Sequence, residues 1–149
     1  MGQYELCGQV LDIAQDLGCR FILTLGGLKR EEVVKTPKLY CAASDPQTLR
    51  EALQYDLEVI GGHIFGVAGL LIGLGSLRGM RGLCILAETL GYPDALAARE
   101  VLRIVCQMLH LKVSLERLDA AVEATKGILK SFGVSVESEE DKARFRGLI

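Results

Sequence analysis

The sequence contains no tryptophan, and aromatic residues make up only 5% of its 149 residues. It also lacks an excess of basic residues, because 17 Lys and Arg stand against 19 Asp and Glu and give a net charge of −2. Such a chain has few aromatic platforms on which single-stranded bases stack, and no broad basic field that attracts phosphate backbones. We therefore expect no nucleic-acid partner.

Metal, disulfide and redox motifs are also missing. The two histidines are far apart in the sequence, and the five cysteines form no CxxC pair: Cys7, Cys19, Cys41, Cys84 and Cys106. An odd, scattered set of this kind indicates neither a disulfide framework nor a metal site. The first residues lack the basic and apolar regions of a signal peptide. These features predict a cytoplasmic protein with no metal ion and no cofactor.

The longest apolar run, residues 64–77, spans 14 residues, which is too short for a bilayer that requires about 20. We expect no membrane span and interpret the run as a buried helix. Its glycines recur at three and four residues, at Gly66, Gly69 and Gly73. This spacing predicts a helix face with almost no side chains, against which another element packs closely.

The sequence does contain alternating helix and strand patterns, within a length suited to one domain. Short continuous apolar runs predict strands that are buried on both faces at residues 19–27, 38–44 and 82–88. Apolar stripes and caps predict helices at residues 3–17, 46–55 and 64–77, with two more beginning at Asp94 and Ser114. This order predicts an α/β fold with a mainly parallel sheet and helices on both faces.

We expect a single α/β domain over residues 1–136. The charged segment 137–149 has too little apolar surface to form a core, so it is either a solvated short helix or a tail that recognises a partner. In the second case its anchors are predicted to be Phe145, Leu148 and Ile149. Three or four strands make a small sheet, and an exposed edge or helix face then predicts a homo-oligomer.

Candidate ligand residues gather where the predicted strands end. Gly26 and Gly27 close one strand, Glu88 and Thr89 close another at the same edge, and His63 opens the glycine-rich helix. Ligands bind at the carboxyl ends of strands in open α/β sheets, although a plain turn and a structural histidine also explain these residues. The chain has no GxxxxGK[ST] loop, nucleophile elbow or paired acid and base. We predict no catalytic residue.

Three segments together resemble the proteasome assembly chaperone superfamily, especially its archaeal members. The first is ILTLGGL, with Gly26 and Gly27. The second is the glycine-rich run that begins GGHIFGVAGLLIGLG, and the third is CILAETLGYPDALAA, with Glu88 and Thr89. Their order and spacing extend the resemblance over most of the chain, roughly residues 4–129.

The resemblance implies a three-layer α/β/α fold similar to purine nucleoside phosphorylases, oligomeric members, and ATP-independent binding to proteasome α-subunits. This chain resembles the C-terminal part of the usual family length. Members that dock on the proteasome often end in a hydrophobic residue, Tyr and any residue, whereas this chain ends in Gly147, Leu148 and Ile149. We predict a proteasome assembly chaperone-like protein that is not an enzyme. The alternative is a small-molecule-binding protein or enzyme that uses the crevice at the strand ends.

Overall fold

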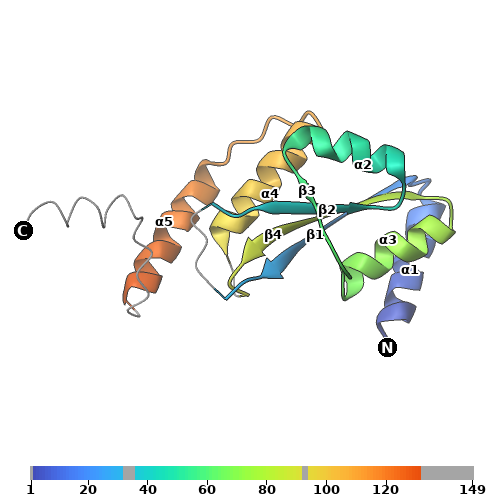
Figure 1. The fold of residues 1–149 in the computed structure, drawn as a ribbon, viewed down its shortest axis with the longest axis horizontal. Coiled ribbons are helices and arrows are strands. Elements are labelled where there is room, and N and C mark those ends of the chain that lie inside the picture. The colour runs from blue at the N-terminus through green and yellow to red at the C-terminus, as the bar shows by residue number, and fades with distance from the viewer. Residues whose placement is uncertain (1, 32–35, 92–93, 132–149) are drawn as a thin grey trace, which may run out of the picture.

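The computed structural model describes residues 2–31, 36–91 and 94–131 (Figure 1). These residues form five α-helices, one 3₁₀ turn and one sheet of four strands. In chain order the elements are α1 (Gln3–Asp16), β1 (Phe21–Lys29), β2 (Leu39–Ala43), α2 (Pro46–Ala52), η1 (Leu53–Tyr55), β3 (Glu58–Val59), α3 (Val67–Leu77), β4 (Arg81–Thr89), α4 (Ala95–Met108) and α5 (Glu116–Ser131). None of these helices has the length and hydropathy that crossing a bilayer requires.

The sheet is mixed, with the strand order β1-β4-β2-β3. β1 pairs with β4 in parallel and β2 pairs with β3 in parallel, whereas β2 and β4 are antiparallel. Two of the three pairings are thus parallel. The antiparallel pairing follows from the short connection between β1 and β2, since a parallel return requires a crossover of a dozen or more residues.

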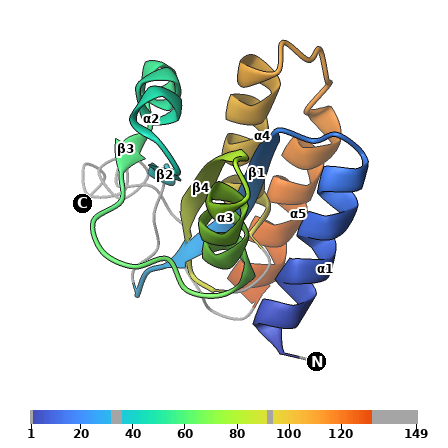
Figure 2. The same ribbon diagram turned by 90° about the vertical axis from the view of Figure 1, so that its right-hand side faces the viewer.

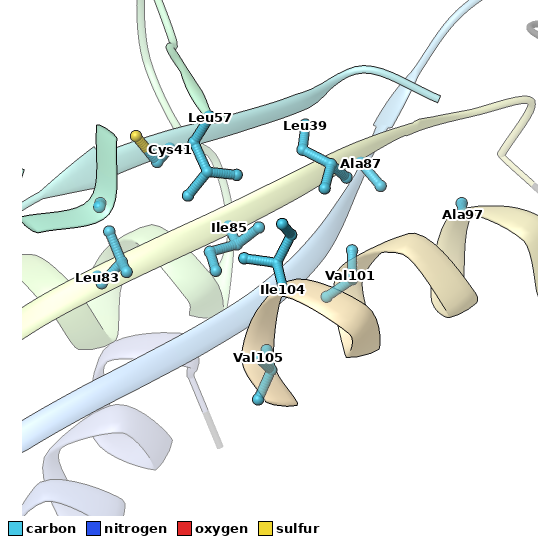
Figure 3. Packing of buried hydrophobic residues seen from close by; sticks show 11 residues of the cluster. Leu39, Cys41, Leu57, Leu83, Ile85, Ala87, Ala97, Val101, Ile104 and Val105 are labelled. Atoms are coloured by element: carbon cyan, nitrogen blue, oxygen red, sulfur yellow. The ribbon is translucent and has the colours of Figure 1, made fainter. Parts of the chain in front are cut away.

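Two hydrophobic clusters, one on each face of the sheet, form the core. On one face Leu83, Ile85 and Ala87 of β4 pack against Val101 and Ile104 of α4 (Figure 3). On the other face Cys84 and Leu86 pack with Ile72 of α3. Helix α1 lies beside α3, and α5 packs on α4 (Figure 2). The three-layer α/β/α architecture predicted from the sequence is therefore confirmed.

Strand β1 differs from its prediction in two ways. The sequence predicts burial on both faces, but β1 is an edge strand in which only Thr24 is buried. The sequence also predicts an end at Gly26 and Gly27, but the strand continues to Lys29 in register with β4. An apolar run does not distinguish an edge strand from a central one, because that position depends on which elements pack beside it.

Helix α3 is shorter and more exposed than the predicted helix over residues 64–77. It begins at Val67, after Gly66 with a left-handed φ of 80°. Only Ile72 and Gly75 of this helix are buried, and Leu77 at its end is exposed. The helix contacts β1, β4 and α1. Its apolar character all round is therefore a poor guide to burial.

The predicted helix starts are confirmed at two aspartate caps. Asp45 accepts a hydrogen bond from the Thr48 N–H at 2.9 Å, and Pro46 occupies the first turn. Asp94 accepts from the Leu96 and Ala97 N–H groups at 3.1 and 3.0 Å. These bonds satisfy N–H groups that a helix start otherwise leaves without a partner.

Candidate functional site

An open groove runs along the carboxyl ends of β1 and β4, beneath α4. Its volume is about 360 Å³, and its lining is mostly apolar. Three of the residues predicted for a crevice line it, namely Gly26, Gly27 and Thr89. The other lining residues are Leu25, Ala87, Asp94, Ala97, Ala98, Val101 and Leu102.

Gly26 and Gly27 lie against side chains of β4. A Cβ atom at Gly26 would lie 2.8 Å from Leu86 Cδ2, and one at Gly27 would lie 2.6 Å from Thr89 Cγ2. Cβ atoms in proteins are essentially never this close to a neighbouring atom. A side chain at either position would therefore require the neighbouring Leu86 or Thr89 side chain to shift.

The polar groups of the groove are already engaged in local hydrogen bonds. Thr89 Oγ1 accepts from the Gly91 N–H at 3.4 Å. Asp94 Oδ1 caps α4 by accepting from Leu96 and Ala97. The described part of the groove thus presents mainly aliphatic surface, which suits an apolar group better than a charged metabolite.

Glu88 lies on the opposite face of the sheet from Thr89, because successive side chains of a strand point to opposite faces. It is 6% exposed. Arg30 donates to Glu88 Oε1 through Nε at 2.9 Å and pairs with it through a second guanidinium nitrogen at 2.8 Å. The Tyr40 hydroxyl donates to the same oxygen at 3.0 Å, and the Lys38 N–H donates to Oε2 at 3.2 Å. We call Arg30, Lys38, Tyr40 and Glu88 the Glu88 cluster.

Electrostatics keep the Glu88 carboxylate charged. Burial raises its pKa, but the hydrogen bonds from the Lys38 N–H, Tyr40 and Arg30, together with the Arg30 charge, hold the pKa below its usual range. Arg30, Lys38 and Tyr40 all donate to this carboxylate. Glu88 of β4 therefore holds the end of β1 and the start of β2 against β4. The ionised carboxylate holds the three strands together through these hydrogen bonds, and it is not free to act as an acid or base.

His63 is separated from both the groove and the Glu88 cluster. It is exposed, it precedes the start of α3 by four residues, and its ring lies 6.2 Å from that of Phe65. Gly66 is the N-cap residue, so His63 does not open the helix as expected from the sequence. Within the described ranges, no group of three His, Cys, Asp or Glu side chains is arranged to hold a metal ion. The predicted tail anchors Phe145, Leu148 and Ile149 lie outside the described residues.

The family assignment comes from comparison of the whole chain with known proteins. The sequence profile described as PAC2 family matches residues 1–132. The chain belongs to the PAC2 family. This assignment confirms the resemblance to proteasome assembly chaperones that the three sequence segments indicated.

Two solved structures show how closely this PAC2 chain follows the fold. Pyrococcus furiosus PbaB, described as an archaeal proteasome activator, has 37% identity and a TM-score of 0.82, and the match covers 89% of this chain and 58% of that one. P. furiosus PbaA, described as an archaeal homolog of proteasome-assembly chaperone, has 23% identity and a TM-score of 0.77, with 87% and 58% covered.

A curated relative is also longer than the PAC2 chain. It is an uncharacterized protein of Methanocaldococcus jannaschii, with 31% identity over 122 residues that cover 80% of this chain. The match covers 47% of the relative, so the chain spans about half the length of the curated relative it matches.

Sequence reasoning missed two features of this PAC2 chain. The first is the set of partners around Glu88, since Arg30 and Tyr40 are 58 and 48 residues away from it in the sequence. No local pattern signals such a long-range cluster. The second is an exposed apolar stripe on α1, formed by Leu6, Val10, Ile13 and Leu17. Their helical spacing is visible in the sequence, but spacing alone does not tell an exposed stripe from a buried one.

Proposed function

We propose that this protein binds proteasome α-subunits without ATP, as an assembly chaperone-like protein. The observation that carries the proposal is the similarity to PbaB, which reaches 37% identity over 89% of this chain. Membership of the PAC2 family and the shared fold with PbaA support it further. The function requires an exposed recognition surface and no reacting group.

The α1 stripe is exposed apolar surface suited to protein contacts. Leu6, Val10, Ile13 and Leu17 follow the spacing i, i+4, i+7 and i+11, which places them along one side of the helix. Ile13 is 60% exposed and Leu17 is 76% exposed. Contiguous exposed apolar residues of this kind mark protein interaction sites.

The direct test is capture of purified archaeal proteasome α-subunits on the immobilised protein, with and without ATP. We expect equal capture in both conditions and no capture of β-subunits. Absence of α-subunit binding would contradict the proposed partner, and binding only with ATP would contradict the proposed mechanism.

A deletion locates the contact within the protein. If the tail recognises the α-subunit, removal of residues 145–149 abolishes capture, because Phe145, Leu148 and Ile149 are its anchors. Circular dichroism and the melting temperature are expected to stay unchanged. Retained capture after the deletion would assign recognition to the folded domain and leave the tail without that role.

We also propose that the protein associates with itself through the α1 stripe. Sedimentation velocity at micromolar concentration should show species larger than the 16.2 kDa chain. Ile13→Glu places a charge in the stripe and should shift the protein toward monomer, whereas Gln9→Glu, at an exposed position outside the stripe, should not. A stable monomer of the unmodified protein at every concentration would refute this proposal.

A further inference from the structure

We draw no further inference here: the strongest candidate, the apolar groove between the carboxyl end of β1 and helix α4, belongs to the candidate site already described, and nothing in the structure shows what covers it in a chain that spans about half the length of the curated relative it matches.

Discussion

Replacement of Glu88 by Gln is expected to lower the free energy of unfolding by about 1.5 to 3 kcal/mol at pH 7, the range for hydrogen bonds to a buried charged group. The buried carboxylate accepts from Arg30, Tyr40 and the Lys38 N–H, which belong to or flank two other strands. A neutral amide offers one acceptor oxygen in place of two charged ones. Urea unfolding of the two proteins measures the difference.

Glu58→Gln provides a matched control in the same region. Glu58 pairs with the Lys38 side chain at 3.1 Å, but the two side chains are 56% and 59% exposed. Exposed ion pairs contribute about 0 to 1 kcal/mol because solvent screens them. The free energy of unfolding of this variant should therefore be close to that of the unmodified protein. An equal loss in both variants would mean that the Glu88 cluster has no special role.

The contribution of Glu88 to the free energy of unfolding should also depend on pH and decrease in acid. The pKa of Glu88 is lower in the folded protein than in the unfolded chain, where a Glu titrates at about 4.3. The stabilisation is therefore complete above that value and is lost as the pH falls through the folded pKa. The amide of the Glu88→Gln variant does not titrate, so the stability gap between the two proteins should narrow below about pH 4. If the stability difference between the two proteins widened in acid, it would contradict the conclusion that Glu88 stabilises the fold in its ionised form.

Local sequence signals predicted the parts of the fold that depend on local physics. The apolar run of β4 forms the central strand, with seven consecutive buried residues. Asp45 and Asp94 cap the helices they were expected to cap, because a carboxylate reaches the first N–H groups in any context. The order of helices and strands then restricted the architecture to layers around one sheet.

Features set by distant contacts were not predictable in the same way. The direction of β2, the edge position of β1 and the short strand β3 all depend on pairing between segments far apart in the sequence. The sequence places Glu88 and Thr89 together at one crevice. The sheet instead directs Thr89 into the groove and Glu88 into a cluster built by the neighbouring strands. Adjacent polar residues in a strand cannot share one face.

The glycines of α3 give the second large expected effect. Gly69→Ala should lower the free energy of unfolding by about 1 to 3 kcal/mol, the usual cost of overpacking. Its new Cβ would overlap the carbonyl oxygen of Ile64, a backbone atom that cannot move aside as a side chain end does. The contact is with the segment that leads into the helix, and not with another element as the glycine spacing predicts. Thermal and urea unfolding measure the loss.

Gly73→Ala is the matched control, since Gly73 lies one turn later in the same helix. No atom lies within 4 Å of a Cβ built at this position. Ala restricts the unfolded chain and favours the helix, so this variant should be as stable as the unmodified protein or more stable by up to about 1 kcal/mol. The two substitutions make the same chemical change with opposite expected signs. No loss of stability in Gly69→Ala would mean that the start of α3 does not pack against Ile64 as described. A loss in Gly73→Ala would mean that Gly73 does not face open space.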